Sequence, residues 1–92
     1  MVINKLKISF LIALYNKEEY IQECVDSCLN QTYDNVEVCI VNDGSTDKSL
    51  DIIYNLYSKN NKVKIFSFKN NKGKVFAYNK AYEFSSGDYF AL

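Results

Sequence analysis

The 92-residue chain contains neither histidine nor arginine. The absence of histidine removes the commonest general base and the commonest metal-binding side chain. Without arginine, any phosphate contact must come from lysine, from backbone N–H groups or from a metal ion. Eleven lysines balance eleven acidic residues, so no net charge attracts nucleic acid or an anionic membrane.

Redox motifs and long apolar runs are also lacking. The three cysteines, Cys24, Cys28 and Cys39, form no C-x-x-C pair, so we expect small buried side chains in a reducing compartment. The apolar run 8–14 is too short to span a bilayer, and no signal-peptide cleavage site follows it. These features favour a cytoplasmic protein, or one held at the cytoplasmic membrane face by parts of a longer chain.

The rest of the chain is organised around the stretch from Val36 to Asp47. Residues 36–41 are apolar and rich in β-branched side chains, which predicts a buried strand. Gly44 then permits a sharp turn, and side-chain oxygens at 45–47 can cap a helix that begins near Lys48. In a strand–turn–helix unit of this kind, ligands bind outside the carboxyl end of the strand.

Strands and helices alternate along the whole chain. Besides the strand at 36–41, we predict strands at 7–14, 63–68 and 88–92, the first buried on both faces and the second near the sheet edge. We predict helices from Glu18, at about 47–58 and at 74–84. Gly87 is expected at the C′ position of the last helix. This order predicts an α/β fold, a Rossmann-like three-layer sandwich with a mostly parallel sheet. Because the chain stops inside the fourth strand, we interpret residues 1–92 as one unit, a fragment of a longer domain.

Three predicted strand ends bring polar side chains to one edge of the sheet. Tyr15 offers an aromatic face for a nucleobase, and Asp43 can accept hydrogen bonds from a ring N–H or a ribose hydroxyl. Lys72 or Lys74, with the start of the third helix, can meet phosphate. The alternative for each of these residues is an ordinary structural role. Tyr15 is then a half-buried tyrosine and Asp43 a turn or cap residue. The two lysines are then solvated surface residues, and Asn16 is a turn former.

Five segments of the chain resemble family 2 glycosyltransferases. They are I-A-L-Y-N at 12–16, C-L-N-Q-T-Y at 28–33, V-N-D-G-S-T-D at 41–47, N-K-G-K-V-F-A-Y-N-K-A at 71–81 and G-D-Y-F-A-L at 87–92. A lone D-G-S carries little information, but five segments in order and in register cover nearly the whole chain. The chain is therefore similar to the N-terminal, nucleotide-sugar-binding half of that family.

The resemblance implies the A-type glycosyltransferase fold and transfer of a sugar from a nucleotide-sugar donor, usually a UDP-sugar, with inversion at the anomeric carbon. It places the backbone of Ala13 beside the base, Tyr15 against the uracil and Asp43 on the base. Asn71 and Gly73 match the loop near the donor. Asn16, at the end of the first strand, completes the expected substrate-binding set.

The chain also departs from the family pattern. Ala13 replaces a usual proline, Asn42 replaces the first Asp of an acidic pair, and Tyr78 stands where arginine is common. The family's acidic metal-binding motif and its catalytic base would fall after Leu92. The resemblance therefore implies a divalent cation, Mg²⁺ or Mn²⁺, for the full-length parent, held by ligands outside this chain. It also implies a fragment without catalytic residues and without activity alone.

We interpret the chain as the donor-binding half of an enzyme that acts on a hydroxyl of a glycan, lipid or protein. The alternative is a non-catalytic nucleotide-binding or interaction module on the same fold; an Asp-x-Asp triplet after Leu92 would favour the enzyme. A phospho-acceptor receiver domain needs an acidic pair where Tyr15-Asn16 stands, and no G-x-G-x-x-G marks a dinucleotide-binding domain. The uncovered fourth strand predicts self-association.

Overall fold

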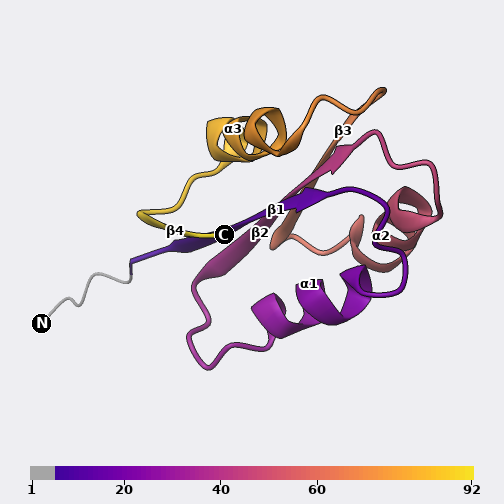
Figure 1. Cartoon of the computed structure of the whole chain (residues 1–92). Coiled ribbons are helices and arrows are strands. Elements are labelled where there is room, and N and C mark those ends of the chain that lie inside the picture. The colour runs from indigo at the N-terminus through magenta and orange to yellow at the C-terminus, as the bar shows by residue number, and fades with distance from the viewer. Residues whose placement is uncertain (1–5) are drawn as a thin grey trace, which may run out of the picture.

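A computed structural model describes residues 6–92, which form a four-stranded parallel sheet between helices on both faces (Figure 1). The elements are β1 (Ile8–Leu14), α1 (Ile21–Leu29), β2 (Val36–Asp43), α2 (Ser49–Tyr57), β3 (Val63–Phe68), α3 (Lys74–Phe84) and β4 (Tyr89–Ala91). The strand order is β3-β2-β1-β4, and every neighbouring pair is parallel. The α/β prediction is confirmed, and so is the position of β3 at the sheet edge.

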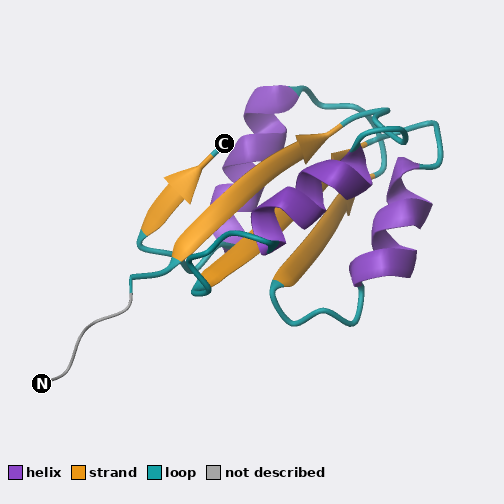
Figure 2. Ribbon diagram, turned by 90° about the horizontal axis from the view of Figure 1, so that it is seen from below, coloured by secondary structure: helices purple, strands orange, loops and turns teal. Residues whose placement is uncertain are grey.

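Strand β2 forms the centre of the core, and all eight of its residues are buried. Its alternate side chains enter two separate clusters. Val38 and Ile40 face α1 and α2, where they join Val25 and Ile53. Cys39 and Val41 face α3, whose alanines 77 and 81 are fully buried against the sheet and let the helix approach closely. Figure 2 shows α3 on one side of the strands and the other two helices on the opposite side.

Strand β1 is less buried than predicted, since Phe10, Ile12 and Ala13 are only partly covered. The reason is the shortness of β4, which pairs with Ile8–Phe10 alone. From Leu11 onward, β1 has no strand neighbour on that side among the described residues. The carboxyl-terminal half of β1 is therefore an open edge.

A buried carboxylate holds the opposite, amino-terminal end of the sheet together. Glu37 in β2 is 2% exposed, accepts hydrogen bonds from Ser9 Oγ at 2.6 Å and from the Ser86 N–H at 2.7 Å, and forms ion pairs with Lys64 at 2.8 Å and Lys7 at 3.3 Å. Burial alone would raise the pKa of Glu37, but the hydrogen bonds from Lys64, Ser86 and Ser9 outweigh it and lower the pKa from 4.5 to about 2. The network joins three strands and the α3–β4 connection.

Gly87 is not the helix C′ residue that we predicted, and glycine is needed there for a different reason. We expected a left-handed C′ residue, but α3 ends at Phe84, its C-cap Ser85 is extended, and Gly87 is not among the residues with positive φ. A Cβ at position 87 would instead lie 2.3 Å from Ser9 Oγ and 2.9 Å from the backbone nitrogen of Ser9. Glycine is needed there because the chain passes directly against β1.

Two helix starts and one cysteine also differ from the prediction. Helix α1 begins at Ile21 rather than Glu18, because Glu18–Tyr20 form a turn in which the Tyr20 N–H donates to the carbonyl of Lys17. Helix α2 begins at Ser49 with Lys48 at its N-cap. Cys24 is exposed rather than buried, since it lines an open hollow beside the half of β1 that has no strand neighbour in the described range. Within the described range, none of the helices has the length and hydropathy of a membrane span.

Candidate functional site

Asn16 ties the turn after β1 to the turn after β2. Its backbone has a φ of 51°, a left-handed conformation that asparagine tolerates better than most residues. Its side-chain Oδ1 accepts hydrogen bonds from the N–H groups of Thr46 at 2.8 Å and Asp47 at 3.2 Å, and its own N–H donates to Ser45 Oγ at 3.0 Å. These bonds fix the position of the preceding residue, Tyr15.

Asp43 ties the end of β2 to the loop that precedes α3. Its side chain accepts hydrogen bonds from the Lys72 N–H at 2.7 Å, the Gly73 N–H at 2.9 Å and Asn71 Nδ2 at 3.3 Å. The residue is only 3% exposed, so these bonds replace most of its contact with water. The carboxylate therefore orders the loop in addition to any contact with a ligand.

Gly44 allows these two segments to touch. Its φ is +68°, and a Cβ there would lie 2.3 Å from the backbone nitrogen of Asn71 and 2.5 Å from the carbonyl carbon of Asn70. Neither backbone atom can move aside without breaking the Asp43 hydrogen bonds. Any side chain at position 44 would therefore open the gap between the β2–α2 turn and the loop before α3.

A small pocket lies at this corner of the molecule. It has a volume of about 230 Å³ and is lined by Ala13, Tyr15, Lys17, Asp43 and Lys74. Tyr15 is 43% exposed, so part of its ring is open to a ligand. Tyr15, directly after β1, and Asp43, the last residue of β2, both border this pocket. We refer to it below as the strand-end pocket.

The other predicted site residues lie around this pocket rather than in it. Asn71 and Gly73 reach it through their hydrogen bonds to Asp43. Asn16 borders a neighbouring hollow together with Glu18, Glu19 and Asp47. Of the two lysines proposed for phosphate, Lys74 lines the pocket, whereas the Lys72 ammonium lies 5.6 Å from the centre of the Phe68 ring.

Sequence reasoning did not include Lys17 among the site residues. It follows the turn at Asn16, and its backbone N–H donates to Ser49 Oγ at 2.9 Å. That bond holds the residue where its side chain reaches the pocket. Its spacing of two residues from Tyr15 was the available signal, but a strand-end turn does not specify the direction of the next side chain.

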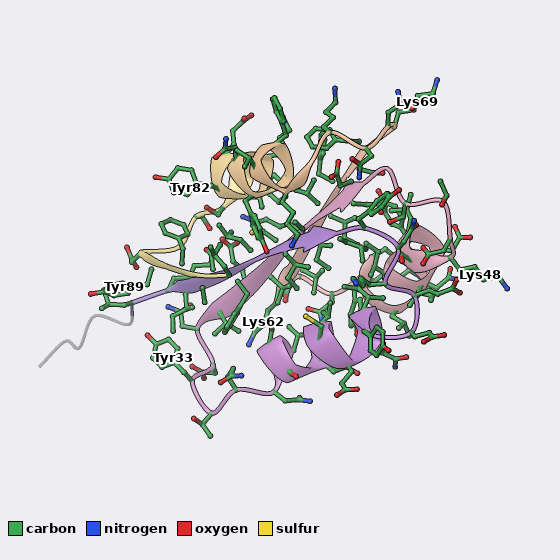
Figure 3. All side chains as sticks on the ribbon, in the orientation of Figure 1. Tyr33, Lys48, Lys62, Lys69, Tyr82 and Tyr89 are labelled. Atoms are coloured by element: carbon green, nitrogen blue, oxygen red, sulfur yellow. The ribbon has the colours of Figure 1, made fainter. Side chains whose placement is uncertain are left out.

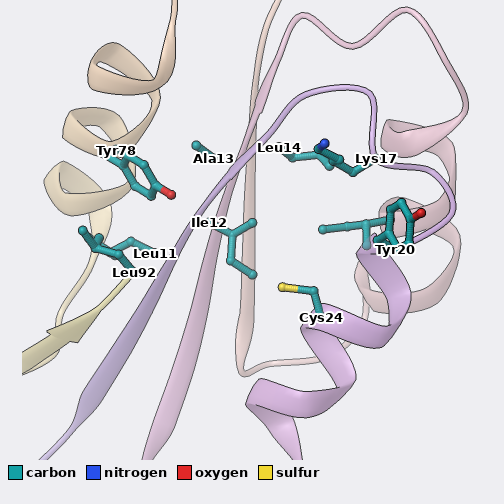
Figure 4. Close-up of a pocket in the computed structure, with 10 residues that line it drawn as sticks. Leu11, Ile12, Ala13, Leu14, Lys17, Tyr20, Cys24, Tyr78 and Leu92 are labelled. Atoms are coloured by element: carbon teal, nitrogen blue, oxygen red, sulfur yellow. The ribbon is translucent and has the colours of Figure 1, made fainter.

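A second hollow, of about 260 Å³, follows the open edge of β1 (Figure 4). Its walls are mainly apolar: Leu11, Ile12, Ala13, Leu14, Tyr20, Ile21, Cys24, Tyr78 and Leu92, with Lys17 at one end. In Figure 4 Tyr78 and Leu92 lie on one side of β1, and Tyr20 and Cys24 lie on the other. It offers neither a carboxylate nor an acid–base pair, so we place the candidate chemistry in the strand-end pocket.

The described residues do not fit a divalent cation. Between residues 6 and 92 no three side chains of the His, Cys, Asp or Glu type converge into a possible metal site. Both oxygens of Asp43, the one carboxylate in the strand-end pocket, already accept hydrogen bonds from the loop. We therefore derive no step through a metal ion from this chain.

Comparison with known proteins gives a consistent result. The sequence matches the family described as "Glycosyl transferase family 2" over residues 9–92. It is 51% identical over 82 residues to a chondroitin synthase of Pasteurella multocida, covering 89% of this chain and 8% of that protein. It is 42% identical over 82 residues to an uncharacterized glycosyltransferase of Haemophilus influenzae, of which it covers 33%. The chain thus spans a third or less of these relatives.

A solved structure shares the fold. It is a mannosyltransferase, PcManGT from Pyrobaculum calidifontis, in complex with GDP-Man and Mn²⁺. The TM-score is 0.83 at 21% identity, over 92% of this chain and 26% of the other. At that identity the likeness establishes the fold alone. The predicted A-type, Rossmann-like architecture and the predicted family are confirmed.

Proposed function

Because this chain belongs to glycosyl transferase family 2, we propose that its strand-end pocket binds the nucleotide of a nucleotide-sugar donor. The family supports sugar transfer in general. The nature of the donor, with UDP as the first candidate, and the inverting course of the reaction are part of the proposal. The supporting observation is that Tyr15 and Asp43 border one pocket.

The pocket has the chemistry that a nucleobase needs. An exposed tyrosine ring provides a stacking surface, and a carboxylate provides an acceptor for a ring N–H. A carboxylate has about four acceptor positions, and the loop uses three of those on Asp43, with Oδ2 accepting from Gly73 and Asn71 and Oδ1 from Lys72 alone. A ring N–H of the base would share Oδ1, which accepts one hydrogen bond from the loop, rather than Oδ2, which accepts two.

The size of the pocket suits part of a donor. Sites that enclose a whole small-molecule ligand usually measure about 300–1,000 Å³. At about 230 Å³, the strand-end pocket is large enough for a base and part of a ribose. The sugar and its acceptor would then be bound by parts of a longer protein, as the limited coverage of the relatives suggests.

In the complete protein, an acceptor hydroxyl on a glycan, lipid or protein would attack the anomeric carbon of the donor sugar. The bond from that carbon to the diphosphate oxygen would break, releasing the nucleoside diphosphate, and the hydroxyl proton would pass to a base outside this chain. The family implies a divalent cation in that protein; its ligands would lie outside this chain, whose described residues offer no such site. We propose a cytoplasmic location, where nucleotide donors would be supplied. The alternative is a non-catalytic nucleotide-binding module, which would bind donor without turnover in the full-length protein.

Titration of the chain with UDP and with GDP tests the proposal. We expect binding that needs no added Mn²⁺, with UDP preferred. Tyr15→Ala should lose about 1–3 kcal/mol of binding free energy, the usual contribution of one aromatic stacking partner, whereas Tyr15→Phe should bind like the wild type. Tyr54→Ala, which removes an exposed tyrosine from α2, is the control. Equal affinity in the wild type and Tyr15→Ala would contradict the assignment.

The isolated chain should have no transferase activity. It supplies a candidate nucleotide pocket but no general base, since it lacks histidine and its pocket carboxylate is bound to the loop. The measurement is release of nucleoside diphosphate from a donor with Mn²⁺ and an acceptor mixture, for this chain and for a longer protein that contains it. Turnover by the 92-residue chain alone would refute this expectation.

We also propose that the isolated chain self-associates through β4 and the adjoining face of α3. The rings of Tyr82 in α3 and Phe90 in β4 pack there with their centroids 4.8 Å apart, and Tyr89 and Leu92 beside them are also exposed. Tyr82 and Tyr89 extend outward from these elements in Figure 3. Apolar surface next to an unpaired strand edge is prone to association. Light scattering on a gel-filtration column should show dimers or larger species; a monomer at high concentration would contradict it.

A further inference from the structure

The charges of this chain are segregated, although they sum to zero. Residues 18–51 hold nine of the eleven acidic residues and one lysine, whereas residues 52–82 hold seven of the eleven lysines and no acidic residue. The first range includes α1, β2 and the start of α2, and the second includes the rest of α2, β3 and most of α3. The balanced total therefore does not describe the field at any one surface of the molecule.

The fold places these charges on opposite faces of the sheet. Glu23 and Asp26 of α1, with Glu19 just before that helix, line an open hollow on the side of the sheet that α1 and α2 cover (Figure 2). Helix α3 covers the other side, and the loop between β3 and α3 rises to the same side of the molecule (Figure 1). Lys69 extends outward from this loop in Figure 3. The molecule thus has an acidic and a basic side.

Apolar side chains are exposed among the lysines of the basic side. Helix α3 packs on the sheet through Ala77 and Ala81, which leaves Val75 and Phe76 in its first turn 72% and 63% exposed. Phe76 and Lys80 are four residues apart and therefore lie on the same side of the helix. Neighbouring apolar side chains next to a lysine-rich loop form an amphipathic surface, which is typical of an interaction site.

Two of the lysines lie against aromatic rings of β3. The Lys80 ammonium lies 4.6 Å from the centre of the Phe66 ring, and the Lys72 ammonium lies 5.6 Å from the centre of the Phe68 ring. These cation–π contacts hold both charges beside α3. Lys80 also pairs with Glu83 at 3.2 Å, but the carboxylate is 70% exposed and the pair is therefore weak. We refer to the following residues as the basic face: Lys69, Lys72, Val75, Phe76 and Lys80.

We propose that the basic face docks on the surface of an anionic lipid bilayer. The lysines are attracted by negative headgroups, and Val75 and Phe76 enter the boundary between headgroups and acyl chains. The same surface repels the acidic side of the molecule, so the segregated charges also set its orientation. A soluble anionic polymer would bind the lysines equally well but would leave Val75 exposed, so the combination favours a bilayer. The inference does not depend on the proposed nucleotide binding.

Flotation of the chain with lipid vesicles tests the role of charge. We expect binding to vesicles of equal parts phosphatidylglycerol and phosphatidylcholine, and at least about 10-fold weaker binding to phosphatidylcholine alone. Lys69→Ala/Lys72→Ala should weaken binding to the anionic vesicles about 10-fold or more. Lys48→Ala/Lys59→Ala removes the same charge from exposed positions on either side of α2 and should stay within about threefold of the wild type.

A second pair of variants tests the apolar contribution. Val75→Ser/Phe76→Ser keeps every charge and should weaken binding to the anionic vesicles about 10-fold at low and at high salt. The loss caused by Lys69→Ala/Lys72→Ala should instead shrink as salt is added, because salt screens exposed charges. Tyr54→Ser/Leu56→Ser removes two exposed apolar side chains from α2 and should bind like the wild type.

Three results would overturn the inference. Binding to heparin, a soluble polyanion, without binding to anionic vesicles would show that the lysines bind a polymer. Equal binding to anionic and neutral vesicles would exclude the lysines as the attracting groups. Unchanged vesicle binding by Val75→Ser/Phe76→Ser would show that no apolar side chain of the basic face enters the bilayer. The UDP titration described above is a separate measurement, so the proposed function and this inference can fail independently.

Discussion

Replacing Asp43 by alanine is expected to abolish nucleotide binding and to lower the free energy of unfolding by about 2–4 kcal/mol. The substitution leaves the N–H groups of Lys72 and Gly73 without their acceptor, and each such group costs about 1–3 kcal/mol where water does not replace the bond. The loop would then move away from β2 and the wall of the pocket would be lost. Urea unfolding and UDP titration measure the two effects separately.

Asp43→Asn separates the two roles of the carboxylate. The amide keeps one acceptor oxygen but turns an NH₂ group toward the other backbone donor, so we expect about half of the stability loss and weak nucleotide binding. Asp51→Ala, on the exposed first turn of α2, is the matched control and should change neither property by more than about 0.5 kcal/mol. Unchanged UDP affinity in Asp43→Ala would show that the base is bound elsewhere.

Replacing Glu37 by glutamine is expected to lower the free energy of unfolding by about 3 kcal/mol near neutral pH. Glutamine keeps the size of the side chain but removes the charge that pairs with Lys64 and Lys7. A domain of this length is usually stable by only about 5–15 kcal/mol, so the change should be plain in urea unfolding. Glu83→Gln removes a carboxylate that is 70% exposed and should cost less than about 1 kcal/mol.

The effect of Glu37 should depend on pH in a defined direction. The pKa of Glu37 is lowered by folding from 4.5 to about 2, so above about pH 4.5 the carboxylate is charged in both states and its stabilisation is fully present. Between these values the unfolded chain binds a proton that the folded chain does not, so stability falls as the pH falls. The difference between wild type and Glu37→Gln should therefore shrink from pH 4.5 downward. A constant difference across this window would contradict the assigned pKa.

Local patterns were enough to predict the elements of the fold. The bounds of β3 and α3 were predicted as 63–68 and 74–84, and the structure has them at those positions. Residues 63–68 alternate in part, Ala77 and Ala81 mark one side of 74–84, and both segments are flanked by Gly or Asn turns. The start of α1 was missed because the acidic residues before Ile21 suit a helix start and a turn equally well.

Contacts between distant segments were not predictable from these patterns. Gly87 lies against Ser9, and Asp43 is bonded to a loop almost thirty residues later. Whether Lys72 or Lys74 enters the pocket depends on the direction in which α3 begins, and the sequence does not specify that direction. Tyr15 and Asp43 were expected at one edge of the sheet, and both line the strand-end pocket because β1 and β2 are parallel neighbours: Tyr15 follows β1, and Asp43 is the last residue of β2.

Strand β2 has one acidic anchor near each of its ends. Glu37 joins the strands and the α3–β4 connection where β2 begins, and Asp43 orders the ligand-side loop where it ends. The two networks share no residue, so sequence changes at the loop tips need not weaken the strand pairing at the base. Such a division would allow the strand-end pocket to diversify among related proteins while the scaffold beneath stays the same.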